Sequence, residues 1–152
     1  RIYNGKFVPL HAPARVSSRN IRDELLKEDS LLPAIYLTQK LDIAVVGIGY
    51  PNEKSAIMAT GYFKENEIES LIDRKVAGEL CMQFYDIYGD TAPYKDDNNV
   101  IGMDISMLRS VPRSIGIAGG VEKLRAVRGA INGHYINTLI TDIECAEALI
   151  SE

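Results

Sequence analysis

The residues of this chain with the greatest potential to bind an anion follow one of its predicted strands. Gly119 and Gly120 separate a predicted strand at residues 114–118 from a predicted helix at residues 121–132, and Lys123 lies on the first turn of that helix. Two glycines permit a tight turn, a helix N-terminus carries partial positive charge, and a lysine adds a full charge. A phosphate group suits this arrangement. A plain strand–helix turn with a solvated lysine explains the same residues equally well.

Two carboxylates accompany a second apolar segment. Glu79 lies within a predicted strand at residues 76–85, and Asp86 follows that strand directly. A buried carboxylate needs hydrogen-bond partners, and the hydroxyls of a sugar are suitable donors. The alternative for both residues is that they point to solvent from an edge strand.

Gly47 and Gly49 end a continuous apolar run at residues 42–49. A dinucleotide-binding fingerprint needs a third glycine three residues later, where this chain has Asn52, and no Walker A motif is present either. These glycines could let a ligand or a neighbouring backbone come close, or they could serve a structural turn alone.

Neither a metal site nor a catalytic triad can be built from the spacing of the other reactive residues. Cys81 and Cys145 are far apart and lack a CxxC context, and His11 and His134 are isolated from each other. We therefore expect no metal, no cofactor and no disulfide, and a cytoplasmic location with buried free thiols.

Composition limits the class of protein. The chain has 152 residues, of which 46% are hydrophobic and 25% charged, and its formal net charge is −4. These values are typical of one soluble globular domain, residues 1–152. The excess of acidic residues does not favour binding to the phosphate backbone of nucleic acid. No apolar run is long enough to span a membrane.

The elements predicted around these residues form an α/β fold. The run at residues 42–49 is typical of a strand buried on both faces of a parallel sheet. From residue 114 onward, strand, helix, strand and helix alternate with short links, which predicts right-handed crossovers on an open, mostly parallel sheet with flanking helices. Ligands of such sheets bind at the carboxyl ends of the strands.

The other elements have local signals. Loops are expected at residues 50–61 and 90–99, where turn residues cluster. Asn20 is a suitable N-cap for a first helix. The remaining predicted strands are at residues 100–103 and 135–140, and the remaining helices are at residues 21–28, from 30 onward, 65–74, 104–108 and 143–150.

Five short motifs, in this order, resemble the C-terminal part of the SorC-type sugar-binding transcriptional regulators of bacteria. The resemblance covers nearly the whole chain. The motifs are LHAP at residues 10–13, DIAVVGIG at 42–49, VAGELC at 76–81, IAGG at 117–120 and ITD at 140–142.

This resemblance implies a phosphosugar-isomerase-like effector domain that senses a phosphorylated sugar and is not an enzyme. Glu79 would bind sugar hydroxyls, Lys123 would meet the phosphate or nearby hydroxyls, and Gly47 and Gly49 would line the pocket. Asp86, Gly119 and Gly120 complete the expected effector-binding set.

The resemblance also implies parts that this sequence does not include. The family's N-terminal DNA-binding domain and the first part of its effector domain are expected to be missing, so DNA would be bound only by a longer protein, as a dimer or tetramer. A sugar-phosphate isomerase or deaminase on the same fold is the alternative function, and a purely structural oligomerisation module is a third.

Overall fold

An open five-stranded sheet lies at the centre of the computed structural model, which describes residues 4–52 and 55–151. The strand order is β3-β2-β1-β4-β5. Strands β1, β4 and β5 run parallel, and β2 and β3 form an antiparallel hairpin at one edge. The strands are β1 (Ile43–Gly49), β2 (Gly78–Leu80), β3 (Gln83–Tyr85), β4 (Arg113–Ile117) and β5 (Thr138–Ile140).

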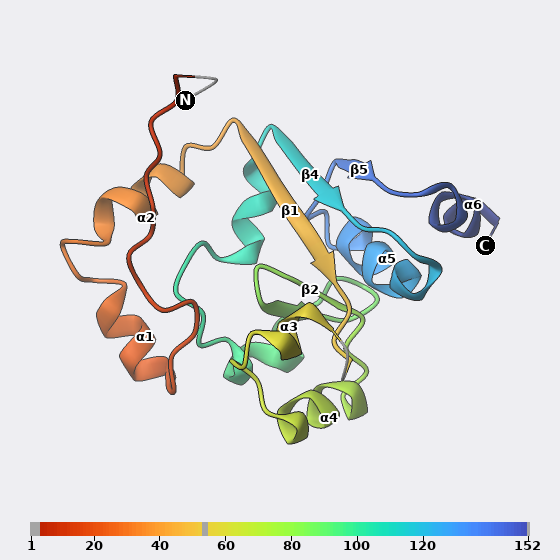
Figure 1. Ribbon diagram of the computed structural model, residues 1–152, viewed down its shortest axis with the longest axis horizontal. Helices are drawn as coiled ribbons and strands as arrows, with labels where there is room; N and C mark the ends of the chain where they lie inside the picture. The colour runs from red at the N-terminus through yellow and green to blue at the C-terminus, as the bar shows by residue number, and fades with distance from the viewer. Residues whose placement is uncertain (1–3, 53–54, 152) are drawn as a thin grey trace.

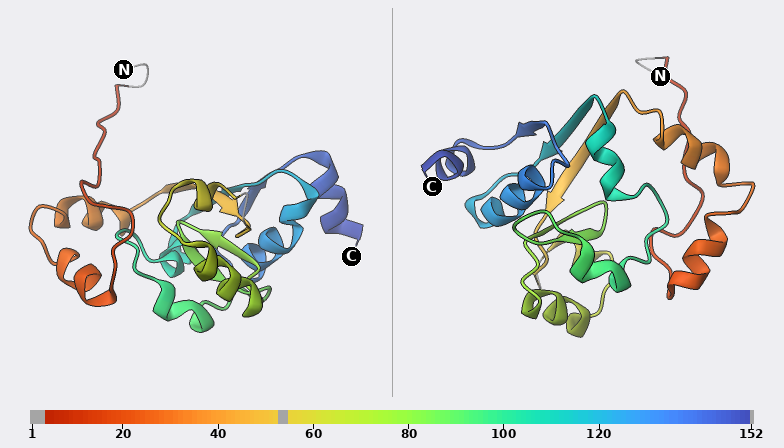
Figure 2. Two further views of the ribbon diagram at one scale, coloured as in Figure 1. Left: turned by 60° about the horizontal axis from the view of Figure 1, so that its bottom comes forward. Right: turned by 180° about the vertical axis from the view of Figure 1, so that it is seen from behind.

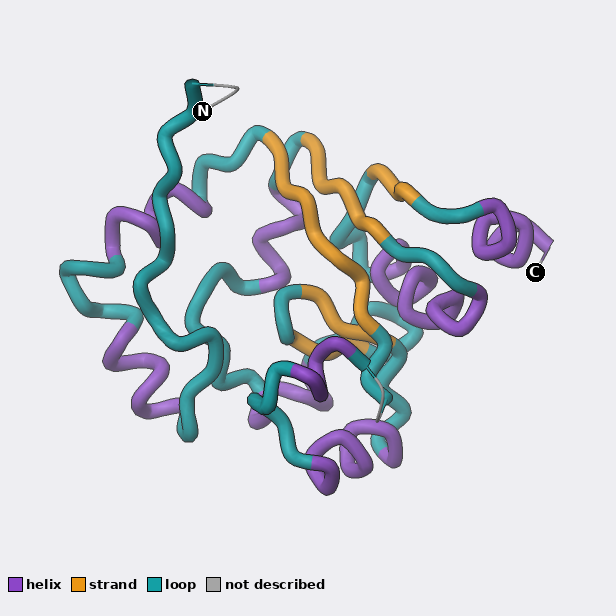
Figure 3. Tube along the Cα trace, in the orientation of Figure 1, coloured by secondary structure: helices purple, strands orange, loops and turns teal. Residues whose placement is uncertain are grey.

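Helices and loops join the strands of this sheet and flank it, as Figure 3 shows. The prediction of an α/β fold with an open, mostly parallel sheet is confirmed. The α-helices are α1 (Arg19–Leu25), α2 (Leu32–Thr38), α3 (Ala56–Ala59), α4 (Glu65–Asp73), α5 (Leu124–Asn132) and α6 (Ile143–Ser151). The 3-10 helices are η1 (Ala92–Asp97), η2 (Ile105–Ser110) and η3 (Val121–Lys123).

Helix α5 packs on one face of the sheet through small residues. Ala126, Val127 and Ala130 are fully buried there. A side chain at Gly129 would overlap the Asp86 carbonyl oxygen and the Tyr85 ring. The Tyr85 hydroxyl donates to the Ala126 carbonyl oxygen over 2.9 Å. These contacts fix the hairpin against α5.

The opposite face of the parallel strands is bare, which corrects the expectation that β1 is buried on both faces. Ile43 and Val45 of β1 are 54% and 62% exposed, while Ala44 and Ile48 on the other face are buried. No helix crosses in front of β1 and β4 in Figure 1, and the views of Figure 2 agree. The sheet therefore has a one-sided core within the described residues.

The strand predicted at residues 76–85 is in fact a hairpin. Its two-residue turn is formed by Cys81 and Met82, with φ of 52° and 62°. Positive φ at both central residues is the geometry that joins two antiparallel strands, although glycine or asparagine is the usual residue there. The absence of a turn residue explains why the sequence pattern looked continuous.

Several smaller predictions are also corrected. The loop expected at residues 90–99 contains η1, and residues 100–103 contribute a single bridge, Val100 with Arg15, instead of a strand. The cap of α1 is Ser18, whose Oγ accepts from the Ile21 N–H, and not Asn20. The helix expected after Asp104 is confirmed as η2, with Asp104 as its N-cap.

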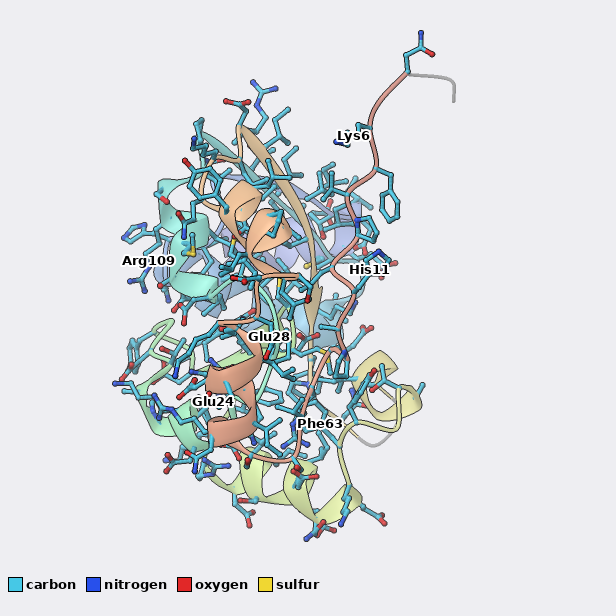
Figure 4. All side chains as sticks on the ribbon, turned by 90° about the vertical axis from the view of Figure 1, so that its left-hand side faces the viewer. Lys6, His11, Glu24, Glu28, Phe63 and Arg109 are labelled. Atoms are coloured by element: carbon cyan, nitrogen blue, oxygen red, sulfur yellow. The ribbon has the colours of Figure 1, made fainter. Side chains whose placement is uncertain are left out.

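The Arg15 side chain joins the N-terminal segment to the rest of the domain through a cation–π contact and an ion pair. The Arg15 guanidinium lies 4.2 Å from the centre of the Phe63 ring and forms a 2.7 Å ion pair with Glu67. Phe63 in turn packs edge-on against Phe84. Figure 4 shows this side of the molecule, with Phe63 beneath the N-terminal segment.

Candidate functional site

A cavity of about 220 Å³ opens beyond the carboxyl end of β1, and we call it the candidate pocket. It lies between the end of β1, the hairpin strand β2 and η3, which is the place where ligands of open α/β sheets bind. Three of the seven predicted site residues line it, namely Gly49, Glu79 and Lys123. The other lining residues are Tyr50, Asn52, Ser55, Ile57 and Glu122.

Glu79 is positioned by the β1–β2 ladder. It lies directly opposite Gly49 in the antiparallel register, and a Cβ at Gly49 would overlap its carboxylate. The second carboxylate oxygen accepts the N–H of Met82 over 2.8 Å. Because β3 is the edge strand, the alternative that Glu79 points to solvent from an edge strand is wrong.

The surroundings of Glu79 oppose its ionisation. Burial raises the pKa of this carboxyl, while the Met82 N–H and the positive charge of Lys123 act in the lowering direction and only partly offset it. Hydrogen-bond donors of a ligand would stabilise the ionised form of this carboxyl, because they would replace the water that it loses on burial.

Lys123 is the last residue of η3 and is half-buried at the pocket wall. Its charge is close enough to Glu79 to act on the pKa of that group. Glu122, the preceding residue, lines the same pocket and is exposed. The pocket therefore combines one ammonium with two carboxyl groups among its described residues.

The diglycine turn is already held by a side chain of this chain. The Gly120 N–H donates to Asp142 Oδ2 over 2.5 Å, and the other oxygen of Asp142 accepts the Cys145 N–H at the start of α6. Gly120 has φ of 95°, a conformation that glycine adopts freely. The amide expected to be open for a phosphate is thus satisfied by Asp142, and neither Gly119 nor Gly120 lines the pocket.

Gly47 and Asp86 also lie outside the pocket. The Gly47 backbone is exposed, with open space where a Cβ would be. One carboxylate oxygen of Asp86 accepts the N–H groups of Tyr88 and Asp90, which shapes the turn after β3. The structure therefore gives Asp86 a local structural role.

Sequence reasoning missed the lining residues Tyr50, Asn52, Ser55 and Glu122. The first three follow β1 directly, so the rule that ligands bind beyond strand ends could have selected them. Glu122 adjoins Lys123 and gave no separate signal.

The described residues contain no alternative centre based on a metal. Across residues 4–52 and 55–151, no three His, Cys, Asp or Glu side chains gather closely enough to hold a metal ion. Both cysteines are free thiols, but the expectation that both are buried is correct only for Cys145, because Cys81 lies in the exposed turn of the hairpin. Every helix of the described chain is too short or too polar to cross a bilayer.

Comparison with known proteins decides the family. The family model described as "Putative sugar-binding domain" matches residues 1–151. This chain belongs to that family.

Among curated relatives, the sorbitol operon regulator of Klebsiella pneumoniae is 33% identical over 138 residues, which are 91% of this chain and 44% of the relative. The transcriptional regulator LsrR of Escherichia coli (strain K12) is 36% identical over 142 residues, or 91% of this chain and 45% of LsrR.

Solved structures of transcriptional regulators share the fold. Full-length SorC of Klebsiella pneumoniae superposes with a TM-score of 0.80 at 33% identity, covering 91% of this chain and 45% of SorC. A DeoR family transcriptional regulator from Listeria monocytogenes gives a TM-score of 0.85 at 26% identity, with 92% and 57% covered. The chain spans less than half the length of the curated relatives it matches.

Proposed function

We propose that this chain is the ligand-sensing part of a bacterial sugar-responsive transcriptional regulator, and that the candidate pocket receives a phosphorylated sugar. The observation that carries the proposal is that Glu79 and Lys123, which are distant in sequence, line one cavity beyond the end of β1. Two observations support the general role: the chain belongs to a family described as a sugar-binding domain, and its relatives include a sorbitol operon regulator and the transcriptional regulator LsrR.

The two charged groups suit the two ends of such a ligand. The Glu79 carboxylate can accept hydrogen bonds from sugar hydroxyls, and the Lys123 ammonium can pair with the phosphate. Asn52 and Ser55 add polar groups to the same wall. Because Asp142 occupies the Gly120 amide, the phosphate would rely on Lys123 and not on the diglycine backbone.

Regulation would follow from a difference in ligand affinity between two arrangements of the effector domain. A ligand shifts an equilibrium only by the difference in its affinity for the two states. In a longer cytoplasmic regulator, this shift would change how a dimer or tetramer fits its operator, with DNA bound by a separate domain. The binding role requires no chemical step by this chain.

A thermal-shift experiment tests the proposal. Pentose and hexose phosphates are added to the chain and to the Lys123→Ala variant. At a ligand concentration a hundredfold above Kd, binding stabilises the native chain by roughly 2.7 kcal/mol. We expect at least one phosphorylated sugar to raise the Tm of the native chain by more than it raises that of the variant. An equal rise in Tm in both proteins would show that Lys123 does not contribute to binding.

The same mixtures test the enzymatic alternative. Glu122 lies in the pocket with Glu79, so a second carboxyl group is available there. Conversion of a sugar phosphate into its isomer, or release of ammonia from an amino sugar phosphate, would support an enzyme. Recovery of unchanged ligand supports the sensing role.

A further inference from the structure

A second cavity, of about 170 Å³, lies between α1 and η1 and is lined by Gln83 and Phe84 of β3, whereas Glu79 of β2 lines the candidate pocket. We call it the α1 cleft. Three cationic side chains line it, from two segments that are more than seventy residues apart: Arg19 and Arg22 of α1, and Lys95 of η1. Asp104 is the one acidic residue among the lining residues.

The lining of the α1 cleft has a net positive charge, opposite in sign to the net charge of the whole chain and of the candidate pocket's lining. The whole chain has a formal net charge of −4, and the candidate pocket has two carboxyl groups against Lys123 alone among its described residues. The lining of the α1 cleft instead has three cations against Asp104, and Asp23, which is not a lining residue, pairs with Arg22. A small dianion that lacks hydroxyl groups should therefore prefer the α1 cleft to the candidate pocket.

Arg22 is already fixed in place at this site. Its Nε donates to the Asp23 carboxylate over 2.9 Å, and one terminal nitrogen lies 2.7 Å from the same oxygen in an ion pair. The other terminal nitrogen donates to the Asn98 carbonyl oxygen over 2.7 Å. The Arg22 side chain is only 17% exposed. A guanidinium has five N–H donors, so two remain for a ligand, and little conformational freedom is lost when they are used.

Arg19 and Lys95 supply the positive charge with which a bound anion could pair. Within the described part of the chain, neither side chain has an ion pair, whereas Arg22 is balanced by Asp23. Arg19 lies three residues before Arg22 and therefore on the same face of α1. Lys95 faces the cleft from η1, and the hydroxyl-bearing Thr91 lines it as well.

We infer that the α1 cleft is a second binding site, separate from the candidate pocket, for a small oxyanion such as inorganic phosphate or the phosphate group of a metabolite. Planar guanidinium groups together with an ammonium are the donors that bind phosphate oxygens in proteins. Such an anion would bridge α1 to η1 and so tie the N-terminal segment to the sheet. The inference does not depend on a sugar ligand in the candidate pocket.

Titration of the isotope-labelled chain with inorganic phosphate, followed by NMR of the backbone amides, tests this site. Sodium chloride at equal ionic strength is the salt control. We expect saturable shifts of amides in α1 and around residues 91–95. In the double variant Arg19→Gln, Lys95→Gln the apparent Kd should rise at least about tenfold. The matched control Lys40→Gln, whose ammonium lies over the Tyr36 ring on α2, should bind as the native chain does.

Lys123→Ala separates this site from the candidate pocket, because it should leave phosphate binding in the α1 cleft unchanged. A parallel titration with glycerol 3-phosphate separates a free ion from a metabolite's phosphate group, according to which of the two binds more tightly. The inference is overturned if the double variant binds phosphate as tightly as the native chain, if Lys123→Ala abolishes the shifts, or if phosphate produces no saturable shift.

Discussion

Glu79 lies directly across the antiparallel ladder from Gly49, and its carboxylate occupies the space that a β-carbon at position 49 would need. The glycine at the end of β1 thus determines where the acidic group of the candidate pocket can lie. This relationship assigns Gly49 a positioning role that does not require contact with a ligand.

Gly49→Ala should therefore displace the Glu79 carboxylate. Since the overlapping atoms are at the far end of a side chain, we expect the fold to survive with a small loss of Tm, while stabilisation by a sugar phosphate is largely lost. Gly47→Ala is the matched control, because open space surrounds that position. Thermal shifts with and without ligand check both variants. Equal ligand responses from Gly49→Ala and Gly47→Ala would contradict the role given to Gly49.

Glu79→Gln should change how stability depends on pH. Burial raises the pKa of Glu79, so the folded chain holds this proton more tightly than the unfolded chain. The contribution of Glu79 to stability is then full below its ordinary pKa of about 4.5 and is lost as the pH rises through the raised value. Glutamine carries no charge and keeps an oxygen for the Met82 N–H.

Urea denaturation across this pH range measures the effect. We expect the free energy of unfolding of the native chain to fall, relative to that of Glu79→Gln, as the pH rises from about 4.5 towards neutrality. A difference between the two proteins that does not change with pH would show that Glu79 is not perturbed by burial.

Asp142→Ala should loosen the turn that precedes Lys123. The variant removes the acceptor for the Gly120 N–H and for the Cys145 N–H. We expect faster hydrogen exchange at both amides, a lower Tm and weaker binding of a sugar phosphate. Asp86→Ala is the control, because Asp86 also accepts two backbone N–H groups, but in a turn away from the pocket. It should lower the Tm and leave ligand affinity intact. Equal ligand affinities in the two variants would show that Asp142 does not support binding in the candidate pocket.

The one-sided core predicts opposite results for two positions of β1. Ile48→Ala removes a fully buried side chain and should lower the free energy of unfolding by about 2–5 kcal/mol. Val45→Ala, on the bare face, should lower it by less than about 1 kcal/mol. Chemical denaturation of both variants measures these values. A large loss at Val45 would mean that this face is covered in solution.

The sequence predicted those parts of the fold whose signals are local. The apolar run at residues 42–49 and the alternation after residue 114 identified β1, β4, α5 and α6, because period and turn residues act over a few positions. The hairpin was missed because Cys81 and Met82 are not turn residues. The bare face was missed because the cover of a sheet depends on distant segments, and Ile43 and Val45 look the same whether covered or not.

The candidate site was predicted in part for the same reason. Glu79 and Lys123 were selected by residue type and by position near strand ends, and the structure brings them together. The role of Asp142 at Gly120 could not be predicted, because it depends on how α6 meets the diglycine turn in three dimensions. Asp86 had the same sequence signal as Glu79, and only the geometry of its turn separates the two.

The most direct test of the central claim is calorimetric titration of the native chain with a sugar phosphate and with the same sugar lacking phosphate. If Lys123 binds the phosphate and Glu79 the hydroxyls, the phosphorylated form should bind at least about tenfold more tightly. In the Arg19→Gln, Lys95→Gln background, in which phosphate binding in the α1 cleft is weakened, Lys123→Gln should remove that preference, while Glu79→Gln should weaken both ligands alike. A preference that persists in Lys123→Gln, or a native chain that binds neither form of any pentose or hexose tested, would contradict the account.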